Sequence, residues 1–438
     1  MKGIINLISC AAFSLFSAAC ASQSQIALDP AGKEPDGKSE FFVPHKQLTS
    51  QPGWHWFAYY DKLETDPSQR YMLAMRVNFE GRTPTENDTI EVGMVDLKDE
   101  SKWTKLGDSH AWGWQQGCQL QFIPQSDCEV IWNDREGDAY VSRIKNVKTG
   151  EVRTLPRPVY ALSPDGKWAI TVDYSRVNDM RPGYGYKGIP DKFAGEKAPS
   201  QSGIWKMDLK TGESKLIISI ADAVAIPNKL DPEFKDAKHW FNHLLVSPDG
   251  RRFIFLNRWS YPDAARNEKY KRVGGFGTRM FTSDADGKNL RAIDPYNYTS
   301  HFIWEPDCKR VLAWTRIPPH GSAFFSIADS DREDVKKVGE GSMPVNGHQT
   351  FLKDPKWVLC DTYPDKGRFQ TVYLFNTKTG RRIDIAKLYS PPAYKGEWRC
   401  DTHPRATPDG KFVTVDSPHN GGRQVYLLDI SEVLKNND

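Results

Sequence analysis

Short apolar or alternating runs, separated by two kinds of polar turn, recur along the chain after about residue 50. Runs such as WAITVDY, RFIFLNRW and FVTVDS are too short for helices and have the alternation of half-buried strands. One kind of turn resembles SPDG and the other resembles DLKTGE. The Pro, Asp and Gly of these turns supply the fixed and positive φ values that a tight turn requires. The pattern therefore predicts β-strands joined by hairpins.

The two kinds of turn alternate, and each occurs seven times. Turns of the SPDG type lie near Pro67, Pro124, Ser163, Ser247, Glu305, Leu352 and Thr407. Turns of the DLKTGE type begin near Val95, Asn146, Met207, Ser283, Ala328, Asn376 and Leu428. Their spacing is that of one four-stranded blade. The sequence therefore predicts an all-β protein, a seven-bladed β-propeller of four-stranded antiparallel blades over residues 49–438.

Two segments of different composition precede the repeats. Lys2 is followed by an apolar stretch over 4–16, too short to span a bilayer as a mature helix, and FSAAC places small residues before Cys20. We expect a signal peptide over 1–21 of the lipoprotein type, with Cys20 as the lipidation site; ordinary signal cleavage is the alternative. The polar segment 22–48 predicts a tether. The protein would then be exported, either anchored by lipid at the bacterial cell surface or outer membrane, or periplasmic, or secreted.

The charge of the chain is nearly balanced, with 59 Lys and Arg against 56 Asp and Glu. It has no long basic run, so nucleic acid is not an expected partner. A basic groove for an acidic ligand remains compatible with this balance, because net charge says little about local patches. We expect a monomer whose membrane attachment, where present, is the lipid alone.

Four histidines occupy one position of the repeat, four residues before the Ser of SPDG or the residue that replaces it. They are His243, His301, His348 and His403. Equivalent positions in successive blades lie at similar heights near the central channel, so these side chains are expected to meet. Imidazoles are common ligands for divalent ions, and Cys400, close to His403, is a further candidate ligand. The pattern predicts a metal site; the alternative is that each His bonds a neighbouring blade.

Polar side chains also gather near the start of the second blade. The stretch SHAWGWQQG contains His110, Gln115 and Gln116 among tryptophans, and the strand EVIWNDRE returns Asn133 towards the same end. Indole rings stack on sugar faces while amides bond hydroxyl groups, so carbohydrate is an expected ligand. Packing between blades is the alternative explanation for the tryptophans.

The third blade and the last blade add further candidates. Tyr160 lies beside the register of the aligned histidines, Arg176 follows one strand later, and a long insertion carries Arg181 and Tyr184. Long insertions on one face of a propeller commonly wall in a binding site. The last blade contains three charged residues that we interpret as fastening the ring rather than as catalytic: Arg399, Asp401 and Arg405.

These motifs together resemble a known group of enzymes. The succession GWQQG, IWND, PVYALSPDG, DYSR, RPGYGY, GHQT and WRCDTHPR, laid over SPDG-type repeats, is similar to that of the seven-bladed propeller polysaccharide lyases. The chain resembles the ulvan lyases most and the oligogalacturonate lyases more distantly. The resemblance implies cleavage of an anionic, uronate-containing, ulvan-like polysaccharide by β-elimination. In that reaction the carboxylate is neutralised, a base removes the C5 proton, and an acid protonates the departing C4 oxygen.

The resemblance also implies roles for single residues. His110 and Tyr160 would form the acid–base pair, and Arg176 would face the carboxylate. Asn133 stands where the ulvan lyases have a second His, although an amide also donates to a carboxylate. Further substrate contacts would come from Gln115, Gln116, Arg181 and Tyr184. The aligned histidines would hold a structural zinc, as in ulvan lyases, or a manganese- or calcium-type ion that binds the uronate, as in oligogalacturonate lyases.

Other classes of protein share the repeat. An oligogalacturonate-type lyase and a non-catalytic surface glycan-binding propeller are the alternatives, and a scaffold like the Tol-associated propeller also fits SPDG repeats alone. A scaffold has no need of His110, Tyr160 and four aligned histidines. A propeller glycosidase normally requires two opposed carboxylates, and no GxSxG motif follows the repeats. We therefore expect a polysaccharide lyase.

Overall fold

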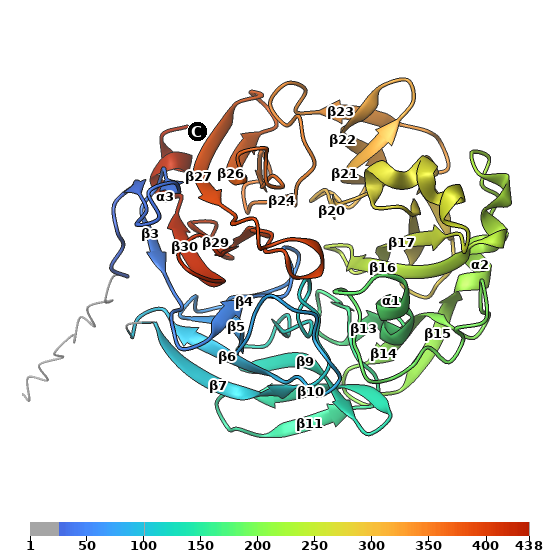
Figure 1. Ribbon diagram of the computed structural model, residues 1–438, viewed down its shortest axis with the longest axis horizontal. Coiled ribbons are helices and arrows are strands. Elements are labelled where there is room, and N and C mark those ends of the chain that lie inside the picture. The colour runs from blue at the N-terminus through green and yellow to red at the C-terminus, as the bar shows by residue number, and fades with distance from the viewer. Residues whose placement is uncertain (1–25, 100, 438) are drawn as a thin grey trace, which may run out of the picture.

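Each pair of repeated turns joins the strands of one antiparallel sheet. The computed structural model describes residues 26–99 and 101–437, and there the chain forms seven sheets around a central axis (Figure 1). The predicted seven-bladed propeller of four-stranded blades is confirmed. Within the consecutive strands of each blade, the first lies nearest the channel and the hairpins lead outwards to the rim.

The first three blades follow one another along the chain. Blade 1 contains β4 (Trp54–Trp56), β5 (Tyr71–Val77), β6 (Ile90–Asp96) and β7 (Lys102–Ser109). Blade 2 contains β8 (Gln121–Phe122), β9 (Glu129–Glu136), β10 (Ala139–Asn146) and β11 (Val152–Leu155). Blade 3 contains β12 (Ala161–Leu162), β13 (Trp168–Thr171), β14 (Gly203–Asp208) and β15 (Ser214–Ser219).

The next four blades complete the ring. Blade 4 contains β16 (Lys238–Val246), β17 (Arg252–Ser260), β18 (Gly277–Asp284) and β19 (Arg291–Asp294). Blade 5 contains β20 (Phe302–Trp304), β21 (Arg310–Ile317), β22 (Gly321–Ala328) and β23 (Val335–Val338). Blade 6 contains β24 (Thr350–Phe351), β25 (Trp357–Cys360), β26 (Phe369–Asn376) and β27 (Arg382–Tyr389). Blade 7 contains β28 (Arg405–Ala406), β29 (Phe412–Ser417) and β30 (Gln424–Asp429).

Short helices lie in the connections between strands. The α-helices are α1 (Tyr174–Met180), α2 (Ile220–Ala225) and α3 (Ser431–Lys435), and the 3₁₀ helices are η1 (Pro232–Asp236), η2 (Ala264–Val273) and η3 (Gly396–Trp398). Within the described part of the chain, no helix combines the length and the apolar character needed to cross a membrane.

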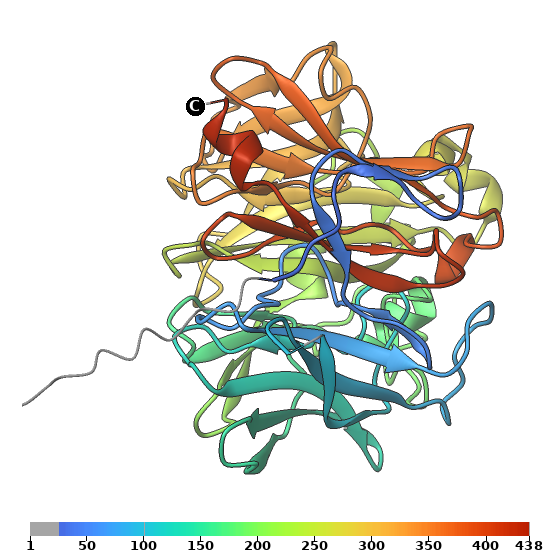
Figure 2. The same ribbon diagram turned by 90° about the vertical axis from the view of Figure 1, so that its left-hand side faces the viewer.

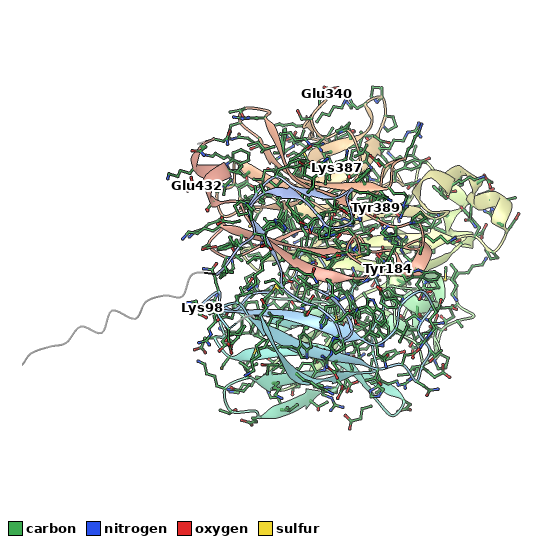
Figure 3. All side chains as sticks on the ribbon, turned by 60° about the vertical axis from the view of Figure 1, so that its left-hand side comes forward. Lys98, Tyr184, Glu340, Lys387, Tyr389 and Glu432 are labelled. Atoms are coloured by element: carbon green, nitrogen blue, oxygen red, sulfur yellow. The ribbon has the colours of Figure 1, made fainter. Side chains whose placement is uncertain are left out.

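Strands from the amino-terminal segment complete the last two blades. β3 (His45–Gln47) pairs with β30 as the outer strand of blade 7, so segments that are far apart in the sequence share one sheet (Figure 2). β2 (Glu40–Phe41) pairs with β27 at Lys387, and β1 (Gly32–Lys33) pairs with β2 (Figure 3). The described part of segment 22–48 is therefore not a free tether, because its main chain covers sheet edges that would otherwise be unpaired. The expected signal peptide and Cys20 lie outside the described residues.

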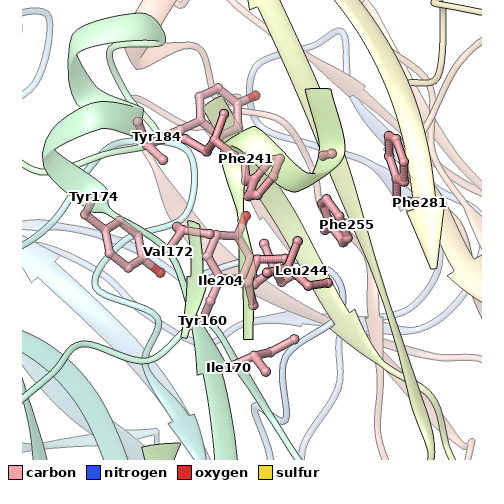
Figure 4. Packing of buried hydrophobic residues seen from close by; sticks show 14 of the residues in the cluster. Tyr160, Ile170, Val172, Tyr174, Tyr184, Ile204, Phe241, Leu244, Phe255 and Phe281 are labelled. Carbon is pink, nitrogen blue, oxygen red and sulfur yellow. The ribbon is translucent and has the colours of Figure 1, made fainter. Parts of the chain in front are cut away.

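Aromatic side chains fill the space between neighbouring blades. In blade 4, Phe241 packs on Phe255 with ring centroids 4.7 Å apart, and Phe255 stacks on Phe281 at 5.3 Å (Figure 4). These residues come from three adjacent strands and face blade 3, whose Tyr160 and Tyr174 belong to the same cluster. Cross-strand aromatic pairs of this kind stabilise a sheet and fix its register.

A buried ion network joins the last blade to the first. Arg405 of β28 donates from Nε to Glu64 Oε2 at 3.2 Å and from Nη2 to Asp416 Oδ1 at 3.0 Å. Glu64 belongs to blade 1, in the connection between β4 and β5, and all three side chains are almost completely buried. The interpretation of Arg405 as a residue that fastens the ring is confirmed. We call Arg405, Glu64 and Asp416 the latch.

Replacing the central residue of the latch should destabilise the whole ring. Arg405→Met leaves Glu64 and Asp416 buried without their cation, which we expect to lower the free energy of unfolding by about 3–5 kcal/mol. Denaturant unfolding of the purified variant measures this cost. Arg70→Met, which removes an ion pair whose arginine is well exposed, is the control and should leave the midpoint unchanged. A latch variant as stable as the wild type would show that the network does not hold the blades together.

Candidate functional site

The four aligned histidines meet at the channel. Ring centroids lie 4.2 Å apart for His301 and His348, 4.4 Å for His348 and His403, and 6.5 Å for His243 and His301. All four are buried, and each lies in the first strand of its blade or within two residues of it. Tyr59, from the start of blade 1, lies among them, 4.7 Å from His403 between ring centroids.

Three of the side chains at this point are arranged as ligands for a metal ion. One ligand atom each from His348, Asp401 and His403 lies within 4.8 Å of the others, and all three residues are buried. Asp401 Oδ1 and His403 Nε2 have no hydrogen-bond partner among the described residues. Buried polar atoms normally have partners, so these two atoms point to a missing ligand. Two imidazoles and a carboxylate suit a divalent ion such as manganese or zinc.

The surroundings of these residues prepare them for that role. His348 Nδ1 lies 3.0 Å from both carboxylate oxygens of Asp361, and Thr402 Oγ1 also donates to Asp361 at 2.6 Å. Asp361 therefore holds the proton of His348 on Nδ1 and leaves the Nε2 lone pair free, as in many metal-bound histidines. Burial and the positive charge of nearby groups hold the pKa of His403 well below its usual range, so this ring is neutral.

The predicted set of metal ligands needs correction in three places. His243 and His301 are not members of the three-residue group, although the ring centroids of His301 and His348 are only 4.2 Å apart. Cys400 is not part of the group, and burial raises the pKa of its thiol, which disfavours the thiolate that a metal requires. Asp401, interpreted from the sequence as a ring-fastening residue, belongs to the group instead. The sequence feature that could have identified Asp401 as a ligand is its position two residues before His403.

A cavity of about 670 Å³ opens beside the histidines. Its walls come from blades 3 to 7 and include four cationic side chains: Arg181, Arg258, Arg316 and Arg399. His243 and His301 line it as well, so the cavity adjoins the histidine cluster. A concave site with several converging cations is suited to an anionic ligand.

Arg258 and Arg181 form the most unusual feature of this cavity. Arg258 is 3% exposed, and neither its Nε nor its Nη1 finds a partner within the part of the chain that the structure describes. Both guanidinium groups lie over the ring of Phe276, at 4.9 Å for Arg258 and 4.5 Å for Arg181. Burial, reinforced by the charge of Arg181, lowers the pKa of Arg258 to about 9. Like charges buried without a counter-charge are costly, so the pair is arranged for an anion that the ligand supplies.

Arg399 connects the cavity with the candidate metal group. Its Nε donates to Asp401 Oδ2 at 2.8 Å, and its Nη2 donates to the hydroxyl of Tyr184 at 2.8 Å. Burial alone raises the pKa of Tyr184, but Arg399 and Arg181 outweigh it and lower the pKa to about 7. The Tyr184 hydroxyl therefore lies between two arginines that line the cavity, and its phenolate form is stabilised.

Arg176, predicted to face a carboxylate, is a structural residue. It is 1% exposed and lies in α1, away from the cavity. Its guanidinium donates to Asp191 and to the main-chain carbonyls of His239, Phe193, Glu196 and Lys197. No donor is left for a ligand, so the prediction is wrong. Arg176 instead anchors the insertion that carries Arg181 and Tyr184.

Tyr160 and His110 also differ from their predicted arrangement. The Tyr160 hydroxyl is buried, donates to Gln116 Oε1 at 2.8 Å and accepts the main-chain N–H of His243 at 2.8 Å. It does not line the cavity. The His110 side chain is 43% exposed and lies beside Asp134, with Nδ1 to Oδ1 at 3.4 Å. The structure does not bring His110 to the cavity either, so the two do not form an acid–base pair there.

The remaining predicted substrate contacts divide into two groups. Asn133 donates to the Val159 carbonyl and to the Tyr186 hydroxyl, and Gln115 donates to the carbonyls of Glu397 and Arg399. These two amides are used in hydrogen bonds that connect segments of the protein. Gln116 contacts His243 and does not line the cavity. Arg181 lines the cavity as predicted, with Tyr184 next to it. Arg258 was missed, although an Arg inside the apolar run RFIFLNRWS is an uncommon feature.

Comparison with known proteins identifies similar folds. No protein-family model matches the chain, and no curated protein matches it. The structure is similar to an oligogalacturonate lyase in complex with manganese, at 17% identity and a TM-score of 0.64, over 94% of this chain and 100% of that one. It is also similar to an oligogalacturonate lyase from Vibrio parahaemolyticus, at 14% identity and a TM-score of 0.60, over 93% and 99%. These similarities show a shared fold along nearly the whole chain.

The metal group can be tested by direct measurement. We expect tag-free protein to take up about one equivalent of a divalent ion, as one three-ligand group provides for, and His403→Ala and Asp401→Asn to lose it. Elemental analysis after dialysis against Mn²⁺ or Zn²⁺ measures occupancy, and added metal should raise the melting temperature of the wild type but not of these two variants. Cys400→Ser is the matched control and should retain the ion. Full occupancy in both ligand variants would exclude this group as the site.

Proposed function

We propose that the protein is a polysaccharide lyase that cleaves uronate-containing chains by β-elimination, most closely in the manner of an oligogalacturonate lyase. The observation that carries the proposal is the buried, unpaired Arg258 beside Arg181, in a cavity that adjoins the group of His348, Asp401 and His403. The arginine pair favours an anionic ligand, and the cavity of about 670 Å³ lies within the range of small-molecule binding sites. Export from the cell stays a prediction, because the signal segment lies outside the described residues.

The chemistry of a uronate explains why these groups lie together. Its C5 proton is weakly acidic and becomes removable when the neighbouring carboxylate is neutralised. A divalent ion held by His348, Asp401 and His403 would supply positive charge for this neutralisation. The manganese in the similar oligogalacturonate lyase supports a manganese-type ion over the structural zinc that the resemblance to ulvan lyases implies. Imidazole and carboxylate ligands are compatible with both metals.

The chain's own residues have distinct parts in this proposal. Arg258 and Arg181 bind a substrate carboxylate and hold it against Phe276, since their unpaired donors face no protein acceptor. Tyr184 is the candidate for proton transfer: it does not line the cavity itself, but its hydroxyl lies between Arg399 and Arg181, which do line it and which stabilise its phenolate. Arg399 also orients Asp401 in the metal group. These roles replace those expected for Arg176, Tyr160 and His110.

A non-catalytic glycan-binding propeller is the second candidate. It would use the same arginine pair to retain an anionic polysaccharide at the cell surface. The arrangement of Tyr184 between two arginines favours catalysis, because ligand retention alone does not need a stabilised phenolate.

Product formation separates the two candidates. We expect the protein, supplied with Mn²⁺, to release an unsaturated uronate from oligogalacturonate or polygalacturonate, followed by the ultraviolet absorbance of the new double bond. Ulvan and a carboxyl-reduced pectin complete the panel. Cleavage of ulvan alone would restore the ulvan-lyase specificity, and binding without any unsaturated product would favour the glycan-binding propeller.

The arginine pair gives a sharper test of how the substrate is held. Arg258→Lys keeps the positive charge but cannot reproduce a two-point contact, so we expect kcat/KM on uronate substrate to fall about 10-fold or more. Steady-state kinetics of the purified variant measure this. Arg251→Lys changes an arginine whose side chain is 85% exposed and lies outside the cavity, and it should leave kcat/KM unchanged. Equal activity of the two variants would remove Arg258 from substrate binding.

A further inference from the structure

His243 differs from the other aligned histidines in what its ring contacts. Its Nδ1 lies 3.2 Å from Nε2 of Gln116. Gln116 in turn is fixed by two donors, because Tyr160 donates its hydroxyl proton to Gln116 Oε1 at 2.8 Å and Gln119 Nε2 donates to the same oxygen at 3.2 Å. His243 also binds Tyr160 through its main-chain N–H, at 2.8 Å. The four side chains form one buried network.

The direction of each hydrogen bond in this network can be worked out. The Tyr160 hydroxyl accepts the main-chain N–H of His243, so its own single proton is free to be donated, and Gln116 Oε1 receives it. Turning the Gln116 amide around would leave that proton without an acceptor. Unsatisfied buried donors are costly, so the amide is held with its NH₂ towards His243.

A ring nitrogen that accepts a hydrogen bond carries no proton. His243 Nδ1 accepts from Gln116, so in the neutral ring the proton is on Nε2. His243 lines the cavity, and Nε2 is the nitrogen that remains for a ligand. His348 is in the opposite state, because it donates from Nδ1 to Asp361 and keeps a lone pair on Nε2. Two histidines at one position of the repeat thus differ at Nε2: His348 has a lone pair there for a cation, and His243 has an N–H there for a hydrogen-bond acceptor.

We infer that His243 is a hydrogen-bond donor to the substrate through its Nε2–H, held in that tautomer by the positioning residues Gln116 and Tyr160, and is not a metal ligand. Its partner would be an oxygen of the anionic sugar that lies between His243 and Arg258. This inference rests on the proposed function for the identity of the ligand, but the tautomer itself does not depend on it. The main chain supports the assignment: His243 has a φ of 54° at a bulge in β16, a conformation uncommon for histidine and often found at functional sites.

The tautomer is directly measurable. Nitrogen-15 NMR of the full-length protein labelled on histidine should show His243 protonated at Nε2 and unprotonated at Nδ1, with the resonance assigned by its loss in His243→Gln. Tyr160→Phe removes the donor that orients Gln116, and Gln116→Glu places an acceptor against Nδ1, so both variants should move protonation towards Nδ1. Tyr174→Phe is the matched control, because Tyr174 stacks beside Tyr160 but donates to the Val159 carbonyl, and it should leave the tautomer unchanged.

Metal binding and kinetics complete the test. His243→Ala should bind Mn²⁺ as the wild type does while kcat on uronate substrate falls about 10²-fold, the usual cost of losing one donor to a developing negative charge. His243→Gln, whose amide also donates, should recover part of that loss. A wild-type ring protonated at Nδ1, or loss of Mn²⁺ in both His243 variants, would overturn the inference. If the wild type cleaves no uronate, the proposed function fails, and the NMR and Mn²⁺ results still decide the state of His243.

Discussion

The site depends on positive charge that the protein buries and does not neutralise. Arg258 is 3% exposed, has unpaired donors, and shares the ring of Phe276 with Arg181. Such an arrangement opposes folding, because the buried Arg258 is repelled by the positive charge of Arg181 and has no counter-charge among the described residues. A fold can retain this arrangement when the binding of an anionic ligand offsets its unfavourable electrostatic energy. The chemistry proposed for the cavity follows from this: the ligand brings the negative charge that the walls lack.

A closed ring can hold such a site. The histidines come from blades 4 to 7 and meet because each of these blades presents its first strand to the same channel. The arginines reach the cavity from other positions: Arg258 from the second strand of blade 4, Arg181 from the insertion of blade 3, and Arg399 from the connection between blades 6 and 7. The ring is closed by β3 pairing with β30 and by the latch, so movement of blade 7 against blade 1 is resisted. Hydrogen bonds then determine, for each histidine separately, which ring nitrogen carries the proton. Asp361 accepts the Nδ1 proton of His348, which leaves Nε2 for the proposed metal, and Gln116 donates to Nδ1 of His243, which leaves Nε2–H for the proposed hydrogen bond to the substrate.

The sequence was sufficient to predict the fold and part of the site. The alternating turns predicted seven blades because turn chemistry and strand length are local properties, and the repeated position of the four histidines predicted their convergence because a propeller repeats its geometry. The individual roles were not predictable in the same way. Tyr160, Arg176 and Gln116 are polar residues of the types found in active sites, but their donors are used up by main-chain groups and by each other, which only the packed structure shows. Arg258 was overlooked because its importance lies in the absence of a partner.

The most direct test of this account is the binding of a uronate oligosaccharide compared with its carboxyl-reduced, neutral counterpart, measured by calorimetry on the wild-type protein. If buried, unpaired arginines are the basis of recognition, the uronate binds and the neutral sugar binds at least about 10²-fold more weakly, since a charged contact to a buried arginine is lost. Equal binding of the two sugars would contradict the account, because the positive charge in the cavity would then serve no part in recognising the ligand.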